Sequence, residues 1–269
     1  MPALLLKIFL APALVASASL AGPRFGPRVG GWLIGFPVVA GPVLWFYARE
    51  QGAAFAAGAA AGTVLGTVSL CCFLATYAWS ATRLRWPGSA LLGWLAFAAA
   101  TLLIDRTPAL RGASLGVRLA AASLALFATG RGLPRLARGA PAPRPRHDLA
   151  WRLLATAALV VTLTAVAGML GPSLSGLVTP FPVATSILVV FAHREAGPGG
   201  VVAVLGGFIP SLYSFTCFCA SLSYGLGHWS VPAAFGGAVL VSLITQTLVL
   251  ASVQGVRVLP TVPGGPHSR

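Results

Sequence analysis

The sequence predicts an all-α membrane protein with about nine transmembrane helices, and three observations predict it. Apolar residues make up 57% of the 269 residues and charged residues only 8%, against roughly 25% charged residues in an average soluble domain. The apolar residues gather in runs of roughly 20, the length at which a helix crosses the hydrocarbon core of a bilayer. The 18 Lys and Arg residues, against four Asp and Glu, cluster between these runs, as they do in loops at a membrane surface.

Nine runs are long and apolar enough for such a helix. Segments that combine Gly, Pro and charged residues separate them, which is typical of turns at an interface. The longest polar stretch, 131–148, is rich in Pro and Arg and is predicted to be a linker. In chain order the runs are 2–21, 29–47, 53–79, 88–104, 113–130, 150–170, 176–192, 199–224 and 231–252.

An internal repeat with a constant offset of 145 residues relates the two halves of the chain. Residues 25–52 align with 170–197 without a gap, and ten of these 28 positions are identical. Apolar composition alone does not explain the joint recurrence of Gly-Pro, Phe-Pro and Arg-Glu pairs, so we interpret the match as a duplication. The run 2–21 corresponds to 150–170, and we therefore expect it to belong to the mature fold rather than to a cleaved signal peptide.

The repeat predicts two four-helix units, 1–104 and 149–252, and a C-terminal tail, 253–269. Between the units lie a connecting helix within 105–130, which has no counterpart, and the basic linker 131–148. If the connecting helix crosses the membrane, the second unit is inverted relative to the first. If it lies on the surface, the two units are parallel. We favour the inverted arrangement because the connecting run is long enough to span and its Arg118 can extend to the interface.

The positive-inside rule then gives an orientation. The 18 Lys and Arg residues divide 13 to 5 between the two sides, whether eight or nine helices are assumed. The rule places the linker and the C-terminus in the cytoplasm, and nine helices place the N-terminus outside. We expect a multi-pass protein of the bacterial inner membrane.

Two Phe-Pro pairs near the middle of their apolar runs predict breaks in membrane helices. A proline inside a helix leaves a carbonyl without its partner, which is tolerated where protein or a water-lined cavity satisfies it. Equivalent breaks in two repeats are typical of transport sites, although a packing kink is the alternative. Hydroxyl groups in 210–224 either line a polar path or bond neighbouring helices. The predicted substrate path comprises Phe36, Pro37, Thr179, Phe181, Pro182, Thr185, Ser186, Ser211, Tyr213, Ser214 and Thr216.

Two Arg-Glu pairs, each followed by a glycine two residues later, are the candidate gates. Arg49-Glu50 and Arg194-Glu195 contain two of the four carboxylates of the chain. Inverted repeats would place them on opposite membrane faces, where the gates of an alternating-access carrier lie. His193 adds a titratable group beside the second pair. The alternative is that both pairs are interfacial anchors at helix ends.

The sequence argues against several other classes of function. The four cysteines, Cys71, Cys72, Cys217 and Cys219, lie inside apolar runs without the spacing of a metal site. The chain has no HExxH, paired-Asp or Ser-His-Asp set, so we expect no enzyme, no metal and no cofactor. The arginines of the linker are expected to be attracted to anionic lipids of the cytoplasmic leaflet. No aromatic residue interleaves them, which argues against nucleic-acid binding.

The Gly-Pro, Phe-Pro and Arg-Glu-x-Gly motifs, repeated twice, resemble those of bacterial multi-pass inner-membrane proteins to which no function is assigned. More distantly, the chain resembles a duplicated version of the small GlpM-like membrane proteins. The resemblance covers about 4–103 and 149–248, and it implies no substrate and no catalytic residue. We expect a transporter or lipid flippase with an unknown small-molecule or lipid substrate and an alternating-access mechanism. An accessory or scaffolding subunit of a membrane complex is the alternative, and association of two copies is left open.

Overall fold

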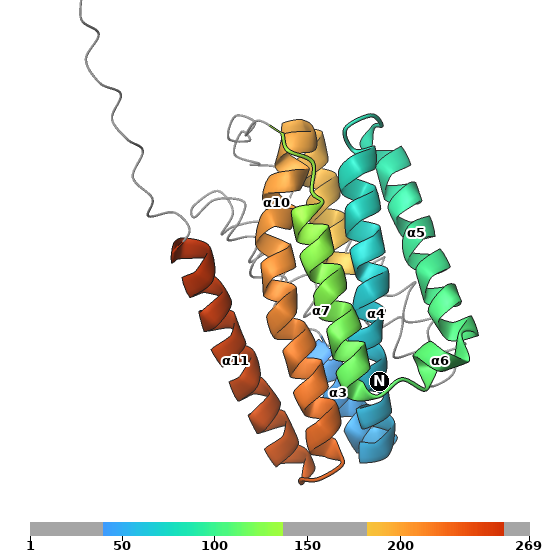
Figure 1. Ribbon diagram of the computed structural model, residues 1–269, viewed down its shortest axis with the longest axis vertical. Helices are drawn as coiled ribbons and strands as arrows, with labels where there is room; N and C mark the ends of the chain where they lie inside the picture. Colours follow the sequence, from blue (N-terminus) through green and yellow to red (C-terminus); the bar gives the residue numbers. More distant parts are fainter. Residues whose placement is uncertain (1–39, 137–181, 256–269) are drawn as a thin grey trace, which may run out of the picture.

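The computed structural model describes residues 40–136 and 182–255, and this part of the chain contains helices and no strand (Figure 1). Several predicted segments, including the runs 2–21 and 150–170, lie outside the described residues. The helices are α3 (Ala40–Glu50), α4 (Ala53–Ser80), α5 (Trp86–Arg106), α6 (Pro108–Arg111), α7 (Leu115–Arg131), α10 (Val183–Leu226) and α11 (Val231–Gly255).

Four of the described helices, α4, α5, α10 and α11, are long and apolar enough to cross a membrane. The outer faces of α5 and α11 expose large aliphatic side chains, for example Leu103 at 67% and Leu248 at 63%. Such continuous apolar faces are rare on soluble monomers but are required of helices that contact lipid. The described part is therefore that of an all-helical membrane protein.

Most of the described helices coincide with predicted runs. The runs 53–79, 88–104, 113–130 and 231–252 correspond to α4, α5, α7 and α11, with ends shifted by a few residues. The runs 176–192 and 199–224 were predicted as two helices, and from residue 183 onward α10 consists of two helical limbs that meet at a kink at Gly197; residues 176–181 lie outside the described part. One residue, Gly197, has non-helical angles and bends α10. We call 183–196 its first limb and 198–226 its second limb. A single glycine is enough to redirect the chain, so no loop is needed there.

Three helix starts have clear local causes. Pro87 lies in the first turn of α5 and Pro232 in that of α11, where a proline removes no intrahelical hydrogen bond. Ser114 is the N-cap of α7, and its Oγ accepts a hydrogen bond from the backbone N–H of Val117 at 3.4 Å. The starts of α5 and α11, Trp86 and Val231, are separated by 145 residues.

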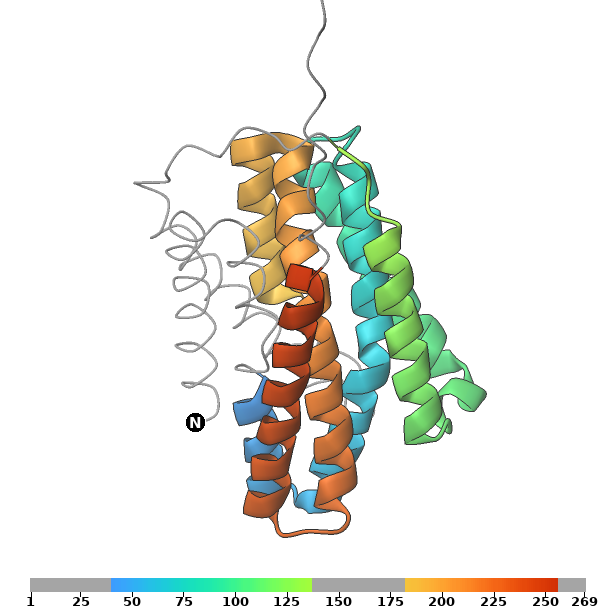
Figure 2. The same cartoon turned by 60° about the vertical axis from the view of Figure 1, so that its left-hand side comes forward.

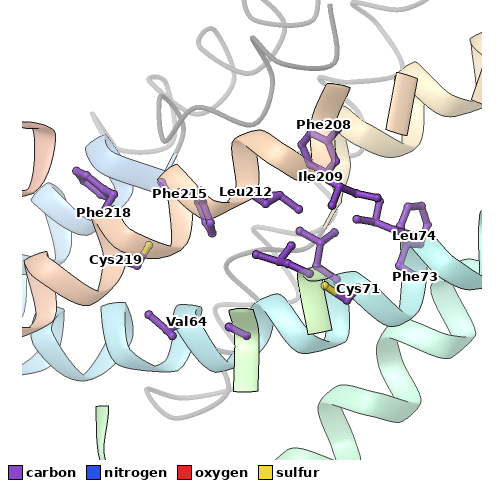
Figure 3. Close-up of a cluster of buried hydrophobic side chains, with 14 of the residues drawn as sticks. Val64, Cys71, Phe73, Leu74, Phe208, Ile209, Leu212, Phe215, Phe218 and Cys219 are labelled. Carbon is purple, nitrogen blue, oxygen red and sulfur yellow. The ribbon is translucent and has the colours of Figure 1, made fainter. Parts of the chain in front are cut away.

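The core lies where α4 packs against α5, α7 and the second limb of α10 (Figure 3). Phe73 on α4 is fully buried, and its ring occupies the space beside Gly93 of α5. A Cβ at Gly93 would lie 2.8 Å from the Phe73 ring, so only glycine fits this crossing. Cys71 and Cys219 are buried in the same core as free thiols, as expected of small apolar residues.

The paths of the helices define two ends of the bundle. At the lower end in Figure 1 lie the α3–α4 turn, α6, the start of α7 and the α10–α11 loop, and we call it the Gly52 end. At the upper end lie the α4–α5 loop, the bend of α10 and the end of α7, and we call it the Gly197 end. Helices α4, α7 and α11 run upwards, whereas α5 and the second limb of α10 run downwards (Figures 1 and 2).

Candidate functional site

Two glycines with the same unusual backbone conformation follow the two Arg-Glu pairs. Gly52, the N-cap of α4, has φ 91° and ψ 161°, and Gly197 has φ 61° and ψ −158°. Both angle pairs fall in a region that is essentially restricted to glycine. Each glycine therefore allows a sharp reversal between a short helix that ends in Arg-Glu and a long helix.

At the Gly197 end, the first limb of α10 contacts aromatic residues of two other helices. The Nδ1 atom of His193 lies 3.5 Å from the hydroxyl oxygen of Tyr77 on α4. The guanidinium of Arg194 lies 6.0 Å from the centre of the Trp86 ring on α5 and 5.7 Å from that of Phe191, within the range of a cation–π interaction. The predicted gate residues His193 and Arg194 thus tie the bend of α10 to α4 and α5, while the neighbouring Glu195 is partly buried.

The arrangement at the Gly52 end is different. Arg49 and Glu50 are exposed at the end of α3. The aromatic contact across this turn is between Tyr47 and Phe55, whose ring centres are 5.3 Å apart. The repeat offset pairs the aromatic residues of the other end, Tyr77 and Trp86, with the apolar Leu222 and Val231. The sequence therefore provides no aromatic counterparts to Tyr77 and Trp86 at this end.

The first limb of α10 begins at a proline. Pro182 is buried and is the N-cap of α10. The residues before it lie outside the described part of the chain, so the helix break at Phe181-Pro182 stays a prediction. Thr185 and Ser186, three and four residues later, are 3% and 1% exposed. The Oγ atom of Ser186 accepts a hydrogen bond from the indole N–H of Trp94 on α5 at 3.0 Å. This bond connects the start of α10 to the α4–α5 half of the bundle.

The four predicted path residues on the second limb of α10 all have hydrogen-bond partners. Ser211 and Thr216 donate to carbonyls one turn earlier, those of Phe208 and Leu212, at 2.7 Å each. The hydroxyl of Tyr213 donates to the carbonyl of Ser123 on α7 at 3.4 Å. Ser214 bonds to Ser242 on α11, at 2.8 Å from both its carbonyl and its hydroxyl oxygen. Tyr213 and Ser214 thus bond to neighbouring helices, whereas Ser211 and Thr216 bond within α10. A role of these residues in a substrate path stays a prediction.

The remaining predicted path residues, Phe36, Pro37, Thr179 and Phe181, lie outside the described residues.

Two features were not found from the sequence. Thr101 on α5 and Gln246 on α11 are each 4% exposed, and their side-chain polar atoms have no hydrogen-bond partner among the described residues. They are separated by 145 residues, the offset of the internal repeat. This equivalence is the signal by which the sequence could have identified them. The second feature is a cavity of about 750 Å³ between α4, α6 and α7, which Arg111 and Arg118 line. Within the described residues, no group of three His, Cys, Asp or Glu side chains is close enough to hold a metal ion.

No family model, no curated protein and no solved structure matches this chain. The similarity to GlpM-like proteins stays a prediction.

Proposed function

We propose that this protein is a transporter or lipid flippase of the bacterial inner membrane, built from two inverted four-helix repeats that alternate access to the two sides. The observation that carries the proposal is the pair Gly52 and Gly197. They occupy equivalent repeat positions, share a conformation restricted to glycine, and lie at opposite ends of the bundle (Figure 1).

The directions of the helices support the inverted arrangement. Helix α4 follows Gly52 and the second limb of α10 follows Gly197, and these two helices run in opposite directions (Figures 1 and 2). The next helices, α5 and α11, also run in opposite directions. A rotation of half a turn about an axis in the membrane plane relates such pairs, as in known inverted-repeat carriers.

Helix α7 supports the same arrangement. It stands alongside α4 and α10 and is not laid across an end of the bundle (Figures 1 and 2). With 17 residues it is about 26 Å long, a few ångströms less than the hydrocarbon core, and it is not one of the four helices that are long and apolar enough to cross a membrane by themselves. A single additional crossing between two four-helix units reverses the orientation of the second.

The charges favour a cytoplasmic Gly197 end. The α4–α5 loop contains Arg83 and Arg85, and the chain after α7 leads through Arg135 towards the basic linker. On the positive-inside rule, this end, the linker and the C-terminus face the cytoplasm. The Gly52 end, where Asp105 and Glu50 partly offset the arginines, then faces outward.

In this mechanism the two Arg-Glu turns are the gates. The inner gate contains His193 and Arg194, which contact Tyr77 and Trp86, and closing it brings the first limb of α10 onto α4 and α5. The outer gate contains Arg49 and Glu50. The cargo passes between the two repeats near the starts of α3 and α10, where Thr185 and Ser186 are buried.

A comparison of lipids and metabolites in cells with and without the protein tests this function. If the protein is a carrier, its deletion changes the level of one lipid or solute class. Expression of the Glu50→Gln/Glu195→Gln double variant in the deletion strain does not restore that level. Asp105→Asn, which removes a carboxylate outside both gates, restores it like the wild type. If the Glu double variant also restores the wild-type state, the protein acts as a scaffold or accessory subunit and the transport proposal is wrong.

Cysteine labelling of two equivalent loops provides a prediction for the inverted arrangement. Thr82 lies between α4 and α5, and Gly227, 145 residues later, between α10 and α11; both are exposed. In a background without the four native cysteines, an impermeant thiol reagent added to intact cells should label Cys at 227 but not at 82. After the membrane is permeabilised, both should react. Labelling of both positions, or of neither, in intact cells would indicate parallel repeats.

A further inference from the structure

The cavity between α4, α6 and α7 differs from the predicted path because it lies on the flank of one repeat. Its wall on α4 is apolar and includes Phe55, Gly58 and Leu65. Arg111 and Arg118 line the opposite side. At about 750 Å³ it has the size of cavities that hold small organic ligands. The connecting segment has no counterpart in the other repeat, so this cavity is specific to one half of the protein.

The two arginines are held in place by backbone carbonyls and retain donors for a ligand. The Nε–H of Arg118 donates to the carbonyl of Ala113 at 2.9 Å, and one of its terminal nitrogens donates to the carbonyl of Arg111. A guanidinium has five N–H groups, so further donors remain. Arg111 lies 3.9 Å from the carboxylate of Asp105, but the described lining of the cavity contains no carboxylate. Asp105 offsets the charge of Arg111, and Arg118 leaves the cavity with a net positive charge.

The position and the wall of the cavity favour a lipid over a free anion. The cavity adjoins the first turns of α4 and α7, at the depth where a spanning helix meets the headgroup region. A Cβ at Gly58 would meet no atom of residues 40–136 or 182–255 within 4 Å, which leaves room along this part of α4 for an acyl chain. A guanidinium pair suits a phosphate group, and the apolar wall suits the hydrocarbon attached to it.

We propose that this cavity binds an anionic phospholipid, with its phosphate at Arg111 and Arg118 and the beginning of an acyl chain along Gly58 and Leu65. The lipid bound here would also identify the class of cargo that the carrier proposed above moves. This second part of the proposal rests on the proposed function. Lipid binding is measured without transport, so failure of either proposal can be distinguished from failure of the other.

Native mass spectrometry of the full-length protein in detergent tests the site with two lipids of equal chain composition. Dioleoylphosphatidylglycerol is expected to bind about tenfold more tightly than dioleoylphosphatidylcholine, and the Arg111→Gln/Arg118→Gln variant should lose about this factor. Gly58→Leu, which fills the wall, should weaken binding of phosphatidylglycerol while the protein stays folded.

Matched controls separate the cavity from the rest of the surface. Arg83→Gln/Arg85→Gln removes two exposed arginines at the other end, and Gly236→Leu adds the same side chain at a helical glycine with equally open surroundings. Both should bind phosphatidylglycerol like the wild type. Equal loss in these controls, or no loss in Gly58→Leu, would overturn the proposal. Displacement of the lipid by millimolar inorganic phosphate would show a free-anion site instead.

Discussion

Replacement of either Gly52 or Gly197 by alanine is expected to lower the free energy of unfolding by about 1–3 kcal/mol. Both glycines have positive φ with ψ near 180°, where a Cβ meets the backbone. At neither glycine would a Cβ have a heavy atom of the described part of the chain within 4 Å, so the expected loss comes from the backbone conformation and not from a clash with a neighbour. Similar losses at the two sites are expected because the two conformations are similar.

Gly58→Ala is the matched control for this prediction. Gly58 also has open surroundings, but it lies inside α4 and has no positive φ. Alanine there should raise the free energy of unfolding by about 0.5–1 kcal/mol because glycine loses more backbone entropy in a helix. The measurement is loss of helical circular dichroism as SDS is added to the protein in a mild detergent. If the alanine variants of Gly52 and Gly58 respond alike, the strained turn is not present in the folded protein.

The sequence predicted those parts of the fold that depend on local composition and on the repeat. Runs of apolar residues gave α4, α5, α7 and α11, and the repeat offset also relates Gly52 to Gly197 and the starts of α5 and α11. The runs 176–192 and 199–224 also predicted a helix on each side of Gly197, and 183–196 and 198–226 are the two limbs that the structure describes. The segment 197–200 contains three glycines and a proline, a composition that favours a break between helices, and Gly197 has the non-helical angles at which the two limbs meet.

The contacts of the candidate gate could not be predicted from the sequence. Arg194 was identified because it recurs as Arg49, but its aromatic neighbour Trp86 is replaced by Val231 in the other repeat. Internal similarity identifies the residues that the two halves share, but it does not identify residues that are present in only one half. The cavity beside Arg118 was missed for the same reason, because α6 and α7 lie outside the repeat.

This asymmetry of the gates leads to a prediction about the two glutamates. Glu50 and Glu195 occupy equivalent repeat positions, yet Glu50 is exposed and Glu195 is partly buried. Exposed ion pairs contribute only about 0–1 kcal/mol to stability, so Glu50→Gln should fold like the wild type. In a carrier, however, a loss of about 1.4 kcal/mol in one state shifts the ratio of the two states tenfold.

Glu50→Gln and Glu195→Gln should therefore change the accessibility of a central cysteine in opposite directions. The probe is Cys at Thr185, which is 3% exposed near the start of α10. Weakening the outer gate favours the outward-facing state and speeds reaction with an impermeant reagent added outside, by up to about tenfold. Weakening the inner gate favours the inward-facing state and slows this reaction. The inner change should be the smaller one, because the contacts of His193 and Arg194 with Tyr77 and Trp86 remain.

Two further variants determine whether a change in the labelling rate comes from the gate residues or from the loss of a negative charge anywhere in the protein. Asp105→Asn removes a carboxylate at the Gly52 end, outside the gate, and should leave the labelling rate unchanged. Trp86→Leu removes the ring beneath Arg194 and, added to Glu195→Gln, should slow labelling further, because cation–π and carboxylate contacts then fail at the same gate. Equal labelling rates in both single glutamate variants, at equal expression, would leave interfacial anchoring as the role of the Arg-Glu turns.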